Sequence, residues 1–179
     1  MAYTERGLVK RSKVYQAKKH VSQLNNKELY YLAVFGRGVR RITRHNHFKR
    51  RLIENKIEIE LKDIVDTLNN LKGGNIIEYN ETYDRKRNVI SQRILLRLNK
   101  IYHIDLDNLG KIVPCYGFVV LNLSTSEVIT GYHNYIGDNH ENIFMGRYNS
   151  DLRVRKIRSG GYPLSQIQPI DSNEMKYAR

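Results

Sequence analysis

The sequence YGFVVLNLSTSEVITGYHN, residues 116–134, decides the fold class. Its first eight residues, 116–123, form a nearly continuous apolar run, which is typical of a strand in the middle of a sheet. Residues 124–126 (Ser-Thr-Ser) predict a tight connection. Residues 127–134 then alternate between two faces and predict the partner strand of a hairpin. This stretch therefore indicates an antiparallel sheet in the second half of the chain.

Two more strand candidates precede this hairpin. Residues 75–79 form one short segment, and residues 90–98 alternate between two faces. We therefore expect three or four antiparallel strands. One face of the sheet is expected to carry Arg93, Arg97, Thr130 and Tyr132.

Three segments in the first half have the periodicity of helices. Residues 22–36 predict a short helix, residues 43–56 a basic helix with one apolar stripe, and residues 58–72 an amphipathic helix. The candidate cap residues are Ser22 or Asn26 before the first helix, Gly36 or Gly38 after it, and Gly73-Gly74 after the third. This order predicts an α+β fold, with the N-terminal helices packed on one face of a small antiparallel sheet.

The length of 179 residues indicates one main domain with a short appendage. We expect residues 1–44 to form a basic N-terminal arm and a short helix, and residues 45–150 to form the α+β domain. Residues 1–20 are polar and poorly periodic, which favours an arm that is disordered or ordered by a partner. Residues 151–179 predict a loop-rich C-terminal tail because Gly and Pro interrupt them.

The charge of the chain points to a polyanionic partner. Lys and Arg number 31 against 18 Asp and Glu, which gives a formal net charge of +13. Such an excess is unfavourable through self-repulsion unless a polyanion neutralises it, so RNA or a ribonucleoprotein is the expected partner. The candidate nucleic-acid contacts are Arg40, Arg41, Arg44, Lys49, Arg50, Arg85, Arg87, Arg97, Arg153 and Arg155.

Other features of the sequence limit the cellular location and the types of disulfide or metal site that we expect. The sequence contains no apolar run long enough to cross a bilayer and no secretory leader, so we expect no membrane partner and a cytoplasmic location. A single cysteine, Cys115, excludes a disulfide framework within the chain and a cysteine-based zinc cluster. We expect no cofactor and no metal.

The residue types of a metal-independent ribonuclease are present. RNA supplies its own nucleophile, the 2′-hydroxyl, so the protein must supply proton carriers and cations. His47 and Arg51 share one face of the predicted helix 43–56, although they could equally form a solvated face. His47 would be the general base or acid. The scissile phosphate would be bound by Arg51, Arg93 and Arg97, and Tyr132 would position a base or the leaving group. His133 or His140 would be the second proton carrier.

A resemblance supports this chemistry. The segments HFKRRLIENKI (47–57), GNIIEY (74–79) and VITGY (128–132) resemble motifs of a family of small phage and bacterial domains related to RelE-type toxins. That family belongs to the barnase–EndoU–colicin–RelE group, so the resemblance implies a RelE/barnase-like fold and endoribonuclease activity without a metal. It covers roughly residues 45–135. The physiological role would then be toxin-like or, in a phage or other mobile element, anti-defence. Residues 134–149 resemble an extension of phage-encoded relatives, which implies an anti-CRISPR role by guide-RNA cleavage.

Two non-catalytic functions fit the same features. The basic face could hold nucleic acid without cutting it, with some of the 13 tyrosines stacking on unpaired bases. Tyr132, Tyr135 and Tyr148 are the candidates for such contacts, whereas Tyr30, Tyr31 and Tyr116 have the pattern of core residues. Alternatively, the positive charge could occupy the nucleic-acid groove of a protein nuclease, and an antitoxin is a further candidate partner. The sequence does not separate these functions.

Overall fold

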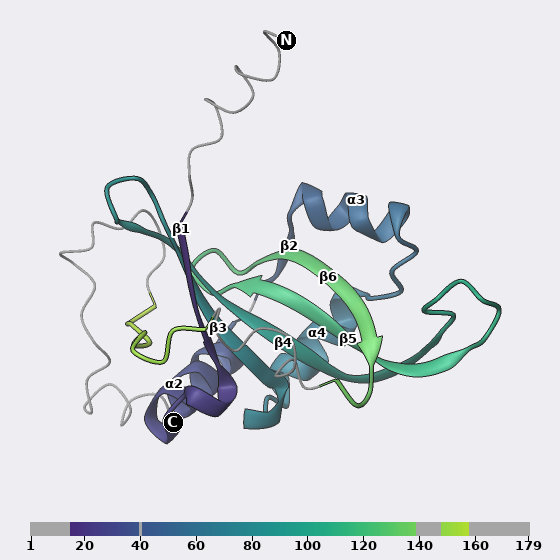
Figure 1. Ribbon diagram of the computed structural model, residues 1–179, viewed down its shortest axis with the longest axis horizontal. Coiled ribbons are helices and arrows are strands. Elements are labelled where there is room, and N and C mark those ends of the chain that lie inside the picture. The colour runs from purple at the N-terminus through teal and green to yellow at the C-terminus, as the bar shows by residue number, and fades with distance from the viewer. Residues whose placement is uncertain (1–14, 40, 139–147, 158–179) are drawn as a thin grey trace, which may run out of the picture.

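The computed structural model describes residues 15–39, 41–138 and 148–157. The chain forms an α+β fold with a six-stranded, mostly antiparallel sheet in the order β1-β3-β4-β5-β6-β2 (Figure 1). The strands are β1 (Tyr15–His20), β2 (Thr43–Arg44), β3 (Ile76–Tyr83), β4 (Val89–Ile104), β5 (Val113–Asn122) and β6 (Glu127–Tyr135). The helices are α2 (Asn26–Arg37), α3 (Asn46–Glu54) and α4 (Leu61–Asn69), with 3-10 turns η1 (Val21–Gln23) and η2 (Gly73–Asn75).

The predicted central hairpin is confirmed as β5 and β6. Val120 pairs with Thr130 and Phe118 with Tyr132 in an antiparallel ladder. Because paired residues share a face, this register places Phe118, Val120, Thr130 and Tyr132 together, with Arg97 beside Phe118 on β4. The prediction that one sheet face carries Arg93, Arg97, Thr130 and Tyr132 is therefore correct.

All three helices contribute to one hydrophobic core on the other face of the sheet. Leu32 of α2, Phe48 of α3 and Ile64 of α4 are fully buried in it. Two strand glycines let the helix side pack closely: a Cβ at Gly131 would lie 2.8 Å from the Phe48 ring, and one at Gly117 would lie 2.8 Å from the Tyr102 ring. The Gly131 contact sets the distance of α3 from β6, and the Gly117 contact lets the Tyr102 ring of β4 lie over β5.

The helix ends differ from the expected caps. The N-cap of α2 is Asn25, whose side chain accepts from the Glu28 N–H, and not Ser22 or Asn26; Gly38 is the C-cap, as one alternative predicted. The helix α3 starts after His45, whose Nδ1 accepts from the His47 N–H. The helix α4 stops at Asn69, and Gly73-Gly74 lie in η2 rather than at the helix end.

The structure contains two strands, β1 and β2, that were not among the three or four strands expected from the sequence. Residues 15–20, expected within the arm, form edge strand β1, which pairs with β3 from Tyr15↔Tyr83 to His20↔Glu78. Residues 43–44, expected to begin a helix, form β2 and pair in parallel with Glu127 and Val128. Both are edge strands with polar side chains, so neither shows the apolar pattern that identifies buried strands. Residues 1–14 lie outside the described residues.

The described part of the expected C-terminal tail also belongs to the folded body. Leu152, Val154 and Ile157 are buried in the core. The Val154 N–H donates to Glu28, and the Ile157 N–H donates to the Tyr31 hydroxyl at 2.8 Å. Residues 158–179 lie outside the described residues.

Candidate functional site

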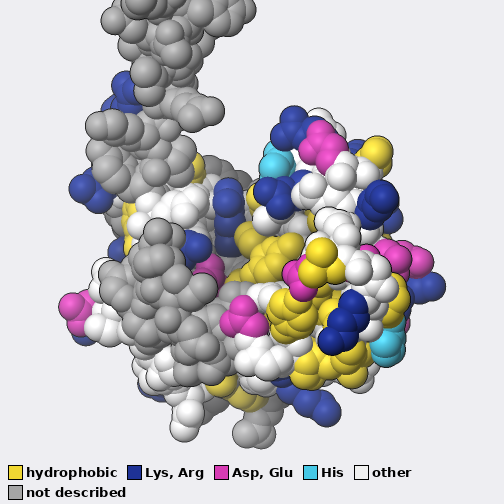
Figure 2. All heavy atoms as spheres, turned by 45° about the vertical axis from the view of Figure 1, so that its right-hand side comes forward, with side chains coloured by type: hydrophobic (Ala, Val, Ile, Leu, Met, Phe, Trp, Pro, Cys, Tyr) yellow, Lys and Arg dark blue, Asp and Glu magenta, His cyan; other side chains and the backbone are white. Residues whose placement is uncertain are grey.

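A pocket of about 590 Å³ opens between three segments of the chain. Its walls are the end of α3 with the loop to α4, the far end of β4 with the turn to β5, and β6. Figure 2 faces the side on which α3 lies, and Lys and Arg side chains gather there around the helix. We call this hollow the α3 pocket; its polar lining includes Arg51, Lys56, Glu58, His103, Asp105, Tyr132 and His133.

The pocket brings together part of the predicted catalytic set. Arg51, Tyr132 and His133 line it. Glu58 and His103 line it too, but the sequence analysis missed them. His103 was not selected as a site residue because β4 continues to Ile104, six residues beyond the expected strand end at residue 98. The strand-forming residues Ile101, Tyr102 and Ile104, just after the expected end, are the signal that could have found it.

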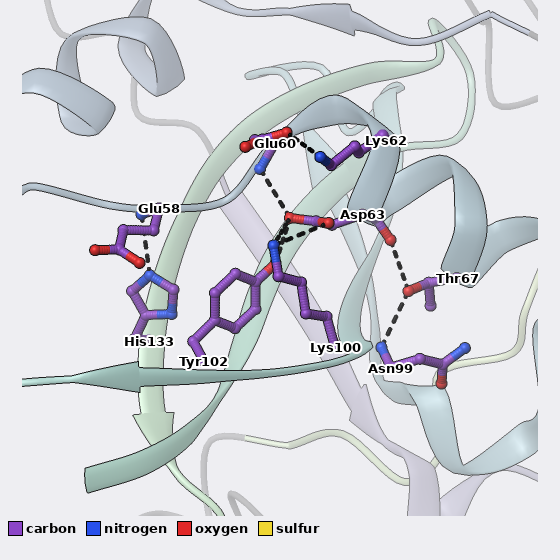
Figure 3. A network of polar contacts seen from close by, with 9 residues as sticks. All are labelled: Glu58, Glu60, Lys62, Asp63, Thr67, Asn99, Lys100, Tyr102 and His133. Atoms are coloured by element: carbon purple, nitrogen blue, oxygen red, sulfur yellow. Dashed lines mark hydrogen bonds and ion pairs between the residues drawn. The ribbon is translucent and has the colours of Figure 1, made fainter. Parts of the chain in front are cut away.

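His133 holds the pocket wall together. Its Nε2 accepts a hydrogen bond from the Glu58 N–H at 3.2 Å, so the chain before α4 is attached to β6 (Figure 3). The ring also lies against Tyr102, with the centroids 4.7 Å apart. Burial lowers the pKa of His133 to about 4. The ring is therefore neutral at pH 7, and the nitrogen that accepts from Glu58 is already occupied.

A polar network fixes the start of α4 behind this wall. Asp63 accepts from the Tyr102 hydroxyl at 2.8 Å, from Lys100 at 3.3 Å and from the Glu60 N–H at 3.1 Å (Figure 3). Burial alone would raise the pKa of Asp63, but these hydrogen bonds and the Lys100 charge outweigh it and lower the pKa. The carboxylate thus stays ionised and joins α4 to β4.

Tyr132 connects the pocket to the opposite sheet face. Its ring stacks on Phe118, with centroids 5.4 Å apart and planes 15° from parallel. Burial raises the pKa of the Tyr132 hydroxyl, with smaller contributions from Glu78 and Asp138. The phenol therefore keeps its proton at neutral pH, which suits a positioning contact better than a proton acceptor.

The remaining catalytic candidates lie elsewhere. His47 is not among the residues lining the pocket; its Nδ1 lies 3.2 Å from a guanidinium nitrogen of Arg50 on the same helix. Arg93 lies on β4 ten residues before His103, a span of roughly 33 Å at the rise of a strand. His140, like the nucleic-acid candidate Arg40, lies outside the described residues.

Several predicted nucleic-acid contacts do gather at one end of the sheet. The ladder pairs Thr82 with Ser91 and Asn122 with Glu127, so the β3–β4 and β5–β6 turns lie at the same end (Figure 1). Strand β2 joins that end through the Thr43 N–H, which donates to Ser126. We call this region the basic end; its cations are Arg41, Arg44, Arg85, Lys86, Arg87 and Arg93.

The other predicted contacts are distributed over the molecule. Lys49 and Arg50 are exposed on α3. Arg97 lies over the Tyr116 ring at 4.8 Å on the helix-free face. Arg153 is exposed, whereas Arg155 forms an ion pair with the fully buried Glu81 at 3.4 Å.

Tyrosines expected to contact bases have partners within the fold. The Tyr148 hydroxyl donates to Glu78 at 2.9 Å, and the Tyr135 hydroxyl donates to Asp107 at 2.5 Å. Tyr31 is 8% exposed and is a core residue, as expected, whereas Tyr30 is 38% exposed, so the expectation for Tyr30 is wrong. Tyr116 is partly buried and packs against the smaller cluster of Ile77, Leu95 and Phe118. Tyr135 is the more accessible of the two bonded rings, at 42% exposed.

The described residues contain no candidate metal centre and no candidate membrane-spanning helix. Within residues 15–39, 41–138 and 148–157, no three His, Cys, Asp or Glu side chains are grouped so that they could hold a metal ion. No helix in the described part of the chain has the length and apolar composition needed to cross a membrane. Comparison of the chain with family models, curated proteins and solved structures found no match.

Proposed function

We propose that this protein binds RNA and cleaves it in the α3 pocket without a metal ion. The observation that carries the proposal is the meeting of Arg51, Glu58 and His103 around one hollow. These residues come from α3, the α3–α4 loop and β4, so the fold and not the sequence makes them neighbours. They supply a cation, a carboxylate and an imidazole, which are the groups that RNA transesterification requires.

The reaction would be an attack of the ribose 2′-hydroxyl on the adjacent phosphorus. Glu58 would accept the 2′ proton as the new P–O2′ bond forms. His103 would donate a proton to O5′ as the P–O5′ bond breaks, leaving a 2′,3′-cyclic phosphate and a 5′-hydroxyl. Arg51 and Lys56 would stabilise the negative charge that develops on the phosphoryl oxygens.

The rest of the RNA would be held by cations outside the pocket. Lys49 and Arg50 extend the positive charge along α3, and Arg44 of β2 directly precedes that helix. Contacts of this kind recognise phosphates and not bases, so affinity would fall steeply with salt. In this proposal the biological role of the cleavage is toxin-like or anti-CRISPR.

Cleavage of labelled RNA in EDTA by matched variants tests the proposal. His103→Ala and Arg51→Gln should each lower the rate by about 100-fold or more, as expected for a lost proton carrier or oxyanion contact. Arg50→Gln is the matched control, because it removes the same charge from the next residue of α3 but not from the pocket lining. Equal rates in Arg50→Gln and Arg51→Gln would exclude the pocket as the site of cleavage.

RNA binding without cleavage is the second candidate function. It is favoured by the state of His133, the half-buried histidine of the pocket, whose Nε2 serves the Glu58 N–H and whose pKa is lowered by burial. If the pocket serves only to bind, RNA would bind tightly with a steep salt dependence and stay intact. His103→Ala would then change the affinity for RNA, and neither the wild type nor the variant would cleave it.

A further inference from the structure

Arg93 has no hydrogen-bond or ion-pair partner among the residues that the structure describes. Its Nε is buried, and none of the residues that the structure describes hydrogen-bonds it. Burial lowers the pKa of the guanidinium, with the Glu127 carboxylate acting in the opposite direction. No ion pair joins Arg93 to Glu127 in the described part of the chain. A half-buried cation of this kind is unfavourable unless something compensates it.

The neighbours of Arg93 have unused hydrogen-bonding groups as well. Asn80 and Asn122 flank it in register on β3 and β5, so all three side chains share the helix-free face. Asn80 and Ser124 are 8% and 9% exposed, yet Oδ1 of Asn80 and Oγ of Ser124 have no partner among the described residues. We call Asn80, Arg93, Asn122 and Ser124 the Arg93 patch.

The patch offers mainly donors. The Ser124 N–H donates to Oδ1 of Asn122 at 3.0 Å, so the amino group of Asn122 is the end left for another partner. The Ser124 hydroxyl can donate, and rotation of the Asn80 amide exchanges its acceptor for a donor of similar size. A guanidinium, two amides and a hydroxyl together match the oxygens of a phosphate group.

We propose that the Arg93 patch is a phosphate-binding site, separate from the α3 pocket. It goes beyond the proposed function because it requires no cleavage. Its ligand is a phosphate group, either free or within a nucleic-acid backbone. The site lies at the basic end, where Arg44 and the β3–β4 turn add positive charge. The Glu127 carboxylate acts on Arg93, and it opposes an anion there.

The test compares inorganic phosphate and a labelled single-stranded RNA on the full chain. If the site takes free phosphate, phosphate should raise the Tm of the wild type above that in chloride of equal ionic strength. Arg93→Gln should abolish this increase, and Glu127→Gln should enlarge it because a repelling carboxylate is lost. If the site takes a backbone phosphate, only RNA affinity changes: Arg93→Gln weakens it about tenfold and lowers the salt slope by about one.

Arg97→Gln is the matched control, because it removes the same charge from the same strand and face but outside the patch. Equal effects of Arg93→Gln and Arg97→Gln on both probes would overturn the proposal. The phosphate measurement involves no RNA and no cleavage, so failure of the catalytic proposal stays distinguishable from failure of this one.

The stability of the free protein provides a second measurement. Because no described residue is bonded to Arg93, Arg93→Gln should leave the Tm in chloride unchanged or raise it. A marked decrease would show that Arg93 is structural and would also overturn the proposal. Asn80→Asp places a carboxylate beside Arg93; it should raise the Tm and reduce binding of both probes.

Discussion

The Glu58 N–H donates to Nε2 of His133 across 75 positions of sequence, at 3.2 Å. This hydrogen bond attaches the loop after α3 to the edge of the sheet and thereby places the Glu58 side chain at the pocket. It requires an unprotonated Nε2, because an imidazolium has no acceptor. The shape of the pocket thus depends on the neutral state of one histidine.

The pH dependence of stability should report this state. The pKa of a histidine in an unfolded chain is about 6.5, whereas burial lowers that of His133 to about 4 in the folded protein. Between these values the unfolded state binds a proton that the folded state does not. The contribution of His133 to the free energy of unfolding therefore falls as the pH decreases from about 6.5 to about 4, by at most about 1.4 kcal/mol per unit.

Thermal unfolding of His133→Gln between pH 4 and pH 7 checks this prediction. The variant should lose less stability on acidification than the wild type. His103→Gln, at an exposed position, should keep the full decrease. Parallel curves for the wild type and His133→Gln would show that His133 is not the group responsible.

Asp63 should contribute to stability through its bonds to β4. Asp63→Asn removes the charge that Lys100 and the Tyr102 hydroxyl contact at 3.3 and 2.8 Å. We expect a loss of about 1–3 kcal/mol in the free energy of unfolding, measured by chemical denaturation. Asp66→Asn on the exposed side of the same helix should change it by less than about 0.5 kcal/mol. Similar losses in both variants would contradict a specific role of Asp63.

The ion pair of Arg155 with Glu81 should hold residues 152–157 on the sheet. Glu81 is fully buried and also accepts from the hydroxyls of Tyr79 and Tyr83. Without the Arg155 cation the buried Glu81 carboxylate has lost its ion-pair partner. Arg155→Met should therefore lower the free energy of unfolding by about 3–5 kcal/mol.

A double-mutant cycle isolates this pair. Adding Glu81→Gln to Arg155→Met should recover part of the loss, because the unpaired buried charge disappears. Arg153→Met, two residues earlier and exposed, is the control and should have little effect. Strict additivity of the two changes would show that the pair is not coupled.

The sequence predicted the elements whose patterns are strong. The β5–β6 hairpin and the amphipathic α4 have clear periods, and each appeared where expected. Strands β1 and β2 could not be found in this way. Their positions depend on pairing with β3 and β6, which lie far away in the sequence and do not alter their own polar composition.

The candidate site was predictable only in part. Arg51 and Tyr132 do line the pocket, but His47 and Arg93 do not. His47 was grouped with Arg51 because they share a helix face, and Arg93 with Tyr132 because they share a sheet face. The unexpected length of β4 carries His103 to the pocket, and the hydrogen bond between Glu58 and His133 brings the α3–α4 loop there. Both relationships are tertiary and leave no periodic trace in the sequence.

The chemical groups at the ends of the RNA fragments test most directly whether the α3 pocket cleaves RNA without a metal ion. Purified protein is incubated with RNA in excess EDTA, and the new termini are identified by mass spectrometry. We expect fragments ending in a 2′,3′-cyclic phosphate with a 5′-hydroxyl on the other side, formed by the wild type and by Arg50→Gln but not by His103→Ala. Intact RNA, or the same fragments from His103→Ala, would contradict this expectation.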